Sequence, residues 1–255
     1  MKNIEIKIDR AKVHFLDMQK KIEEFFQSNP YQVDIKRNEE KRPIHYVSKI
    51  QEVPIEIPLL AGEVIHNLRS ALDYVAYRLF IINTPEGDGK HIYFPISDDS
   101  VKYAFEKVKK TNGLSQPAKD LIDSFNPYKG GNDVLWQIHR LNNIDKHRLL
   151  VTVGSSFKSI DMGGFGLRKH FPDIAATVEI PPLFFNAGDN LFPLKEGDEL
   201  FIDLPDAEGD KQMKFKFNLV LHESGIIEGE NIVEVLNKMI AETVSIISDF
   251  AVLIV

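Results

Sequence analysis

The spacing of apolar residues changes from a helical to a strand-like period near residue 148, and this change limits the chain to a mixed fold. Before it, apolar side chains recur every three to four residues, as on one face of a helix. After it, they alternate with polar ones. In residues 214–223, two phenylalanines and two leucines alternate with two lysines and an asparagine. Such a strand is typical of a sheet with one buried and one solvated face.

The order of these patterns predicts an α+β protein: a helical bundle with an N-terminal β-hairpin arm, and an antiparallel β-meander or small sandwich before the last helix. We expect a single domain over residues 1–255, with a helical core at about 9–28, 59–147 and 230–250 and a β part at about 31–58 and 149–222. Strands are expected at 149–162, 176–181, 198–205 and 214–223, with a hairpin turn at 162–166.

Charge is distributed unevenly along the chain. The net charge is −7, so the protein as a whole is a poor candidate for non-specific binding of nucleic acid. Residues 129–170, however, carry seven Lys or Arg against three Asp, a net charge of +4, which leaves −11 on the rest. We therefore expect an anionic ligand to be steered to this middle segment.

The chain contains no cysteine, which excludes disulfides, thiolate metal sites and cysteine nucleophiles. Its first residues lack the apolar stretch of a signal peptide. Glu242 and Asp249 interrupt the apolar segment near residue 250, which predicts a buried helix rather than a membrane span. We expect a cytoplasmic protein that has no cofactor and does not contact a membrane.

Residues 59–82 give the strongest helical pattern, because nine apolar side chains fall within an arc of ~140° that predicts a core face. His66 and Asp73 lie opposite this arc, and Arg69 at its edge is spaced to pair with Asp73. Neither Lys nor Glu occurs in residues 64–85, although these residue types usually coat an exposed helix. The composition favours a second, polar and half-buried interface over an ordinary solvated face.

The stretch "IHRLNNIDKHRLLV", residues 138–151, concentrates proton carriers and cations. Asn142 and Asp145 fall on the apolar stripe of its helix and are predicted to point inward, where a carboxylate needs a partner. A neighbouring stripe consists of Arg140, Asn143 and His147. We expect this helix and helix 59–82 to face each other across a polar seam.

The seam supplies the candidate site residues. The candidates for binding are His66, Asn67, Arg69, Asp73, Asn142, Asp145, Lys146 and Arg148. If the site is catalytic, the reacting groups are expected to be Arg140, Asn143 and His147.

Three interpretations of the seam remain open. A satisfied network of ion pairs and hydrogen bonds would fix how the helices meet and leave a non-catalytic interaction module. A phosphodiester-cleaving or RNA-binding site would use Arg140 to hold a phosphate and His147 to carry a proton. A divalent metal site would draw on His66, Asp73, His139, Asp145 and His147.

The R-x6-H spacing of Arg140 and His147 resembles the R-x4-6-H motif of HEPN-domain ribonucleases, which are all-helical and need no metal. The resemblance covers about a dozen residues, and the large β region departs from that family. It implies a metal-independent site directed at RNA, which is the interpretation we favour. The expected partners are RNA or another anionic ligand, and a second copy of the chain bound through helical faces.

Longer blocks resemble a family of uncharacterised bacterial proteins that carry H-N-L-R-S-A-L-D and N-x-D-K-H-R blocks at similar separation. The matching segments are "GEVIHNLRSALDYVAYRL" (62–79), "FPI" (94–96), "NPYKGG" (126–131), "LNNIDKHRLLV" (141–151) and "PLKEGDEL" (193–200). The resemblance implies that the two main blocks belong to one site, and it implies no activity. Tyr74 stands where that family has His, so the first block lacks the R-x4-H that Arg69 would otherwise begin, and the ribonuclease interpretation of this block is weaker.

Overall fold

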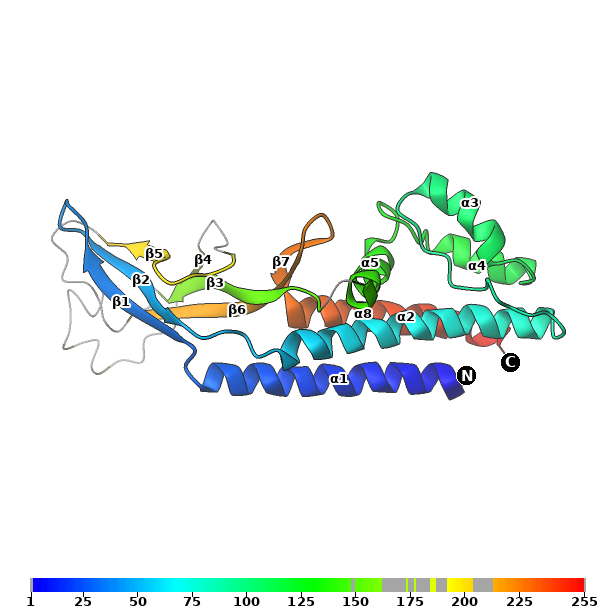
Figure 1. Cartoon of the computed structure of the whole chain (residues 1–255), viewed down its shortest axis with the longest axis horizontal. Coiled ribbons are helices and arrows are strands. Elements are labelled where there is room, and N and C mark those ends of the chain that lie inside the picture. Colours follow the sequence, from blue (N-terminus) through cyan, green and yellow to red (C-terminus); the bar gives the residue numbers. More distant parts are fainter. Residues whose placement is uncertain are drawn as a thin grey trace. The chain divides into compact units, whose positions relative to one another are not determined.

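The computed structural model describes residues 2–147, 150–161, 173, 177, 184–186, 192–203 and 213–254, and these form the predicted α+β fold (Figure 1). The helices are α1 (Lys2–Gln27), α2 (Glu56–Asn83), α3 (Ser100–Lys110), α4 (Gln116–Ser124), α5 (Asp133–His147) and α8 (Ile232–Asp249), followed by the 3₁₀ helix η1 (Phe250–Leu253). The strands are β1 (Tyr31–Arg37), β2 (Pro43–Ile50), β3 (Val153–Asp161), β4 (Phe184–Asn186), β5 (Glu199–Ile202), β6 (Lys214–Glu223) and β7 (Ile227–Asn231).

These elements gather into two compact units. The helical unit comprises residues 1–21, 55–152 and 222–255, and the sheet unit comprises residues 22–54 and 153–221. That the whole chain forms one domain stays a prediction. Within the part of the chain that the structure describes, no helix is both long and apolar enough to cross a bilayer.

The core of the helical unit forms where α5 and α8 pack on α2 (Figure 1). The apolar arc predicted for α2 is fully buried: Ala61, Val64, Ile65, Leu68, Ala71, Leu72, Val75, Ala76 and Leu79. Leu135, Ile138 and Leu141 of α5 and Leu236 and Met239 of α8 are also buried. Each large side chain buried in this way contributes ~1.5–3 kcal/mol, so this arc anchors the helix that presents the candidate residues.

The prediction placed the first helix at residues 9–28, but α1 begins at Lys2. Ile4, Ile6 and Ile8 alternate along the sequence as they would in a strand. In the structure Ile4 and Ile8 are buried, whereas Ile6 is 48% exposed. The two buried residues, Ile4 and Ile8, are four apart, which is a helical spacing. The short segment fits both a helical and a strand period, and tertiary burial decides between them.

Two further boundaries differ from the prediction. The segment "VPIEIP" (53–58) was expected to be a strand, but α2 begins within it at Glu56 with Pro58 in the first turn. Proline is tolerated there because the first amides of a helix have no intrahelical partner. Strand β7 (Ile227–Asn231) was not predicted, and Asn231 at its end caps α8 through the amides of Val233 and Glu234.

The sheet unit contains the predicted hairpin of β1 and β2, which pair in antiparallel register from Tyr31 opposite Ile50 to Arg37 opposite Pro43. The three-stranded sheet has the order β1-β2-β5, and the second sheet has the order β4-β3-β6-β7, of which β7 belongs to the helical unit. The core of the unit consists of Val47, Phe157, Ile160, Leu194, Leu200 and Met213.

Strand β6 follows the predicted alternation only in its first half. Lys214 and Lys216 are exposed there, but Val220 on the same face is 3% exposed, so the second half is covered on both faces. The expected strand at 176–181, apart from Thr177, and the expected turn at 162–166 lie outside the described residues.

Candidate functional site

The polar residues of α2 point in different directions. Asn67 is 4% exposed and faces α1, where the Lys7 Nζ donates to its Oδ1 at 3.3 Å. The Asn67 Nδ2 donates to the Glu63 carbonyl at 2.7 Å. Asn67 was expected to join the residues of α5, but its bond with Lys7 links α2 to α1 instead, and its other bond lies within α2.

The predicted seam between α2 and α5 is formed by His66, Asn142 and Asp145. The His66 Nδ1 lies 3.2 Å from the Asn142 Oδ1, and Asn142 is 2% exposed. Asp145 packs against Gly62, where an added Cβ would lie 2.9 Å from the Asp145 Cγ. Glycine therefore makes room for a half-buried carboxylate. Burial and Glu63 raise the pKa of Asp145, against the opposing effect of His66 and Lys146.

The predicted pair of Arg69 and Asp73 forms, and it binds a loop rather than α5. The Arg69 Nη2 lies 2.9 Å from the Asp73 Oδ1 and donates to the Phe94 carbonyl at 2.9 Å. The Phe94 amide in turn donates to the Asp73 Oδ1 at 3.0 Å. This closed set of bonds fixes the backbone at Phe94 on α2.

Burial dominates the electrostatics of this pair. It lowers the pKa of Arg69 and raises the pKa of Asp73, and in each case the charge of the partner opposes the effect. A guanidinium stays protonated in proteins, so Arg69 is a buried cation whose compensation depends on Asp73. Its second nitrogen, Nη1, is buried and finds no hydrogen-bond partner among the described residues.

Cations from three helices gather near the stripe of α5 that carries Arg140, Asn143 and His147, which we call the outer stripe. Arg69, Lys110 and Arg140 all lie close enough to His139 to lower its pKa, after burial itself. Lys146 and Lys110 likewise act on the Asp73 carboxylate. We call this set the basic cluster: Arg69, Lys110, His139, Arg140 and Lys146.

Carboxylates neutralise part of the basic cluster. The Lys110 Nζ lies 2.6 Å from the Glu106 Oε2. The Arg140 Nη1 lies 3.7 Å from the Asp98 Oδ1, too far for a hydrogen bond, and the Arg140 side chain is 44% exposed. Lys146 is exposed and forms no ion pair with the side chains that the structure describes. Arg140 and Lys146 are therefore the cations of the cluster most able to meet a ligand.

His139 is a neutral member of the cluster at pH 7, because burial lowers its pKa to about 4. The Asn143 Nδ2 lies 3.3 Å from the His139 Nε2. If the amide donates, the ring proton resides on Nδ1, which is buried and has no partner in the described part of the chain. Asn143, expected to be catalytic, thus orients His139.

The remaining candidates cannot be placed at atomic detail. His147 is in the last turn of α5, but its side chain lies outside the described residues, as does Arg148. The R-x6-H prediction therefore stays a prediction. No group of three or more His, Asp and Glu residues suited to a metal ion occurs within the described ranges.

Lys110 was not anticipated as part of a binding site, and His139 was considered only as a possible metal ligand. Lys110 belongs to a separate helix with three lysines in its last turn, an arrangement that ordinarily complements the helix dipole. Only the folding of residues 94–110 against α2 and α5 brings it near the candidate residues. Local sequence offered no signal for this juxtaposition.

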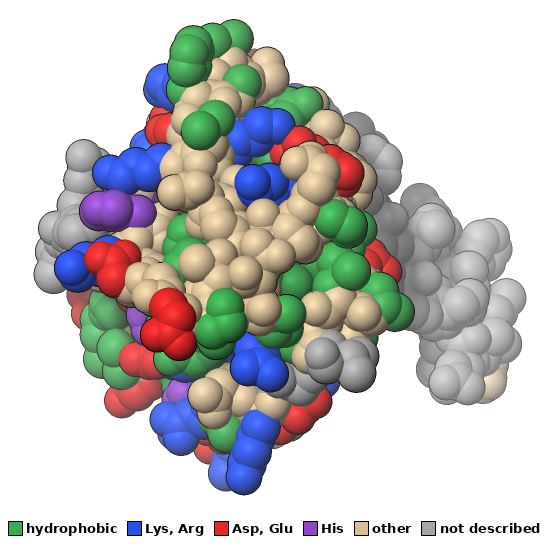
Figure 2. Space-filling model, turned by 90° about the vertical axis from the view of Figure 1, so that its right-hand side faces the viewer, with side chains coloured by type: hydrophobic (Ala, Val, Ile, Leu, Met, Phe, Trp, Pro, Cys, Tyr) green, Lys and Arg blue, Asp and Glu red, His purple; other side chains and the backbone are tan. Residues whose placement is uncertain are grey.

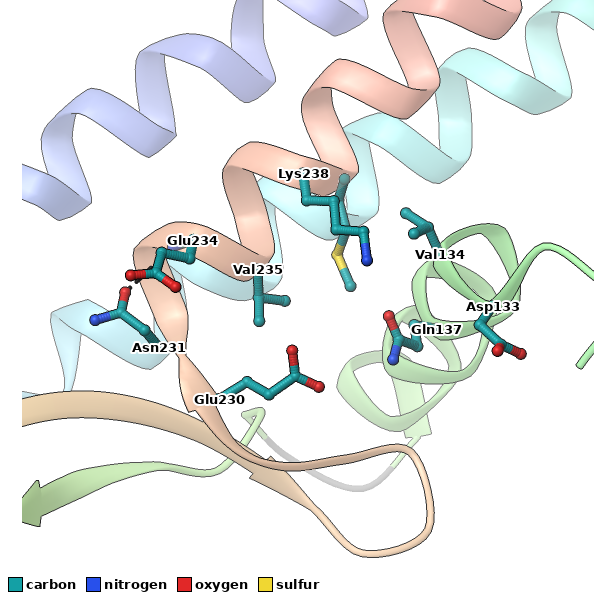
Figure 3. A pocket seen from close by; sticks show the side chains of 9 residues that line it. Asp133, Val134, Gln137, Glu230, Asn231, Glu234, Val235 and Lys238 are labelled. Atoms are coloured by element: carbon teal, nitrogen blue, oxygen red, sulfur yellow. Dashed lines mark hydrogen bonds between the residues drawn. The ribbon is translucent and has the colours of Figure 1, made fainter. Parts of the chain in front are cut away.

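A separate polar pocket of about 480 Å³ lies between α5 and α8 (Figure 3). Asp133, Glu230 and Glu234 place carboxylates around it, and Lys238 is the one lining cation. This excess of negative charge disfavours a phosphate group, so an anionic ligand is better placed at the basic cluster.

Comparison of the chain with protein-family models, curated proteins and solved structures gave no match. The chemistry of the site therefore rests on its own residues. The inward seam is packed and hydrogen-bonded, whereas the outer stripe of α5 offers exposed cations beside a buried neutral histidine.

Proposed function

We propose that the helical unit carries an RNA-directed site on the outer stripe of α5. Arg140 and Lys146 hold the phosphates of the RNA backbone, and His147 transfers the proton if the strand is cleaved. The observation that supports this most is the basic cluster, in which α2, α3 and α5 contribute cations to one region of an otherwise acidic protein. Such local concentration of charge steers anions to a site.

The loose pairing of Arg140 is suited to this role. Its contact with Asp98 at 3.7 Å is longer than a hydrogen bond, and both side chains are more than 40% exposed. Exposed pairs of this kind contribute ~0–1 kcal/mol. Exchange of the Asp98 carboxylate for a phosphate that accepts two guanidinium hydrogen bonds therefore costs little and favours binding.

We assign different roles to His139 and His147 because His139 is buried. His139 has a pKa of about 4, so it is neutral and does not add a charge to phosphate binding at pH 7. A proton carrier operating near neutral pH needs a pKa close to that value. We therefore assign the proton transfer to His147, the last residue of α5, whereas His139 is a neutral ring that Asn143 orients.

The test uses fluorescence anisotropy with a labelled single-stranded RNA of roughly 20 nucleotides at several salt concentrations. Arg140→Ala and Lys146→Ala are each expected to weaken binding and to reduce the salt slope by about 1. Lys12→Ala is the matched control, because it removes one exposed cation from α1 of the same unit. Equal losses in all three variants would show that net charge, rather than this site, governs binding.

Cleavage is measured separately with the same RNA in the presence of EDTA. His147→Ala is expected to abolish cleavage and to leave RNA affinity within about twofold of wild type. If the wild type binds RNA and leaves it intact, the site is a binding site without hydrolysis. If RNA does not bind at moderate salt, the proposal fails.

A second candidate function, a non-catalytic interaction module, is favoured by a specific surface on α3. Val101, Phe105 and Val108 lie one turn apart on its outer face and are 65%, 76% and 69% exposed. Figure 2 views this end of the molecule and shows hydrophobic side chains at the top, where α3 lies. An exposed apolar ridge of this kind marks an interaction surface.

The charges of α3 fit a second copy of the chain as the occupant. Asp98 and Asp99 precede the helix, and its last turn carries Lys107, Lys109 and Lys110. Two antiparallel copies of α3 would therefore place acidic ends beside basic ends and oppose their dipoles, whereas parallel copies would repel. The inward seam of α2 and α5 is structural in this alternative.

The mass of the protein in solution, from light scattering across a range of concentrations, tests this surface. Phe105→Glu is expected to give a monomer. Leu16→Glu, at a 63% exposed position of α1, is the matched control and is expected to dimerise like the wild type. A wild type that stays monomeric at ~100 μM would remove the argument for a second copy.

A further inference from the structure

We propose that a pocket beside the Tyr-rich face of α2 binds a single nucleotide unit, with its base against tyrosine rings and its phosphate held by two cations. The pocket lies within the helical unit and has a volume of about 550 Å³. Its lining comes from the first turn of α1 and the C-terminal third of α2: Lys2, Asn3, Ile4, Tyr74, Tyr77, Arg78 and Ile81.

The tyrosines provide a surface for a planar ring. Tyr74 and Tyr77 are 43% and 45% exposed, and their spacing of three residues places them on neighbouring turns of one helix face. Stacking on aromatic side chains is the general means by which proteins hold an unpaired base, because every base has a π face. These residues also explain why this face of α2 lacks Lys and Glu.

Tyr77 is held in position before any ligand binds. Its ring lies 6.3 Å from that of Phe80, at an interplanar angle of 34°. On another side the chain passes so close at Gly89 that an added Cβ would lie 2.6 Å from the Tyr77 Cε2. Gly89 has a φ of +59°, which glycine adopts without strain. A ring fixed in this way loses little entropy when a base stacks on it.

The cations of the pocket determine the charge of the ligand. Neither Arg78 nor Lys2 forms an ion pair with the residues that the structure describes, and both line the same pocket. The nearest acid on this part of α2, Asp73, is bound to Arg69. Two uncompensated cations beside two aromatic rings fit a ligand that combines a planar base with a phosphate, and Asn3 can bond a base edge through its amide.

The nucleotide unit has two sources, a free mononucleotide or one nucleotide of an RNA strand. The RNA source rests on the proposed function, whereas the free nucleotide does not. Calorimetry on the full chain with AMP, adenosine, inorganic phosphate and a short RNA separates them. Displacement of AMP by the RNA identifies the strand as the source, and AMP binding without displacement identifies the free nucleotide.

The variants test each part of the pocket. Tyr77→Ala is expected to weaken AMP binding about fivefold or more, and Tyr77→Phe to stay within about twofold because it keeps the ring. Arg78→Ala is expected to weaken AMP binding and to leave adenosine binding unchanged. Arg10→Ala removes an exposed arginine from α1 outside the pocket and is expected to bind AMP like the wild type.

The proposal is overturned if AMP binds more weakly than ~10 mM, if inorganic phosphate binds as tightly as AMP, or if Tyr77→Ala binds AMP normally. Because Tyr77→Phe keeps the packing against Phe80, a fold defect in Tyr77→Ala does not hide the result. Arg140→Ala distinguishes this pocket from the site on α5. It is expected to lose RNA affinity while binding AMP like the wild type.

Discussion

The stability of the helical unit should fall between pH 7 and pH 4 because of one histidine. Burial, together with the charges of Arg69, Lys110 and Arg140, lowers the pKa of His139 from 6.5 to about 4, against the opposing effect of Asp98. Protonation would also place a second N–H in a site where Nδ1 already lacks a partner among the described residues. Both effects disfavour the charged ring in the folded state.

The sign and size of the effect follow from the two pKa values. Between pH 6.5 and pH 4 the unfolded chain binds a proton at this position and the folded chain does not, so stability is lost as the pH falls through this window. A fall from 6.5 to about 4 corresponds to a loss of ~3 kcal/mol at pH 4. Hydrogen bonds with Trp136 and Lys110 lower the pKa values of the neighbouring Asp98 and Glu106, respectively.

The assay is urea unfolding of the wild type and of His139→Gln at intervals between pH 7 and pH 4, followed by tryptophan fluorescence. Trp136 is the one tryptophan of the chain and lies in α5, so the signal reports the helical unit. Subtracting the free energy of unfolding of His139→Gln from that of the wild type at each pH removes the titration of all other groups. If this difference changes by less than ~1 kcal/mol between pH 7 and pH 4, the account of His139 as a buried, unsatisfied ring is refuted.

Three further substitutions test the packing, each by thermal or urea unfolding. Gly62→Ala gains ~1 kcal/mol of helix propensity, but its Cβ collides with Asp145, so the free energy of unfolding should fall by ~1–2 kcal/mol. Adding Asp145→Ala in a double variant should relieve this loss. Asp73→Ala leaves the buried Arg69 guanidinium uncompensated and should cost ~3–5 kcal/mol; a loss under ~1 kcal/mol would mean that water reaches the guanidinium. Asn132 accepts a hydrogen bond from an amide in the first turn of α5 at 3.1 Å, so Asn132→Ala should cost ~1 kcal/mol, and no change would show that the cap is dispensable.

The elements that were predictable from the sequence are those in which local pattern and tertiary burial agree. The apolar arc of α2 consists of nine side chains at helical spacing, and all nine are buried as expected. The pair of Arg69 and Asp73 was predictable because its members are one turn apart on the same helix. The inward direction of Asn142 followed from the same geometry.

The rest depends on which segment packs against which, and a single sequence carries little of that information. The partner of Arg69 and Asp73 is the backbone at Phe94, whose hydrogen-bonding groups are common to all residues. Lys110 reaches the basic cluster only through the path of residues 94–110. Strand β7 has no apolar alternation of its own, because "IEGEN" buries one side chain, Ile227, and otherwise pairs through its backbone.

The helical unit is assembled from three stretches of sequence, and α8 packs on α2 and α5 although more than a hundred residues separate α2 from it. During translation, α2 therefore leaves the ribosome long before the helix that completes its core. The apolar arc from Ala61 to Leu79 stays without its final cover while the sheet unit is being synthesised. Until α8 (Ile232–Asp249) has been synthesised, the nascent chain is therefore expected to expose this apolar face, and exposed apolar surface of this kind favours aggregation.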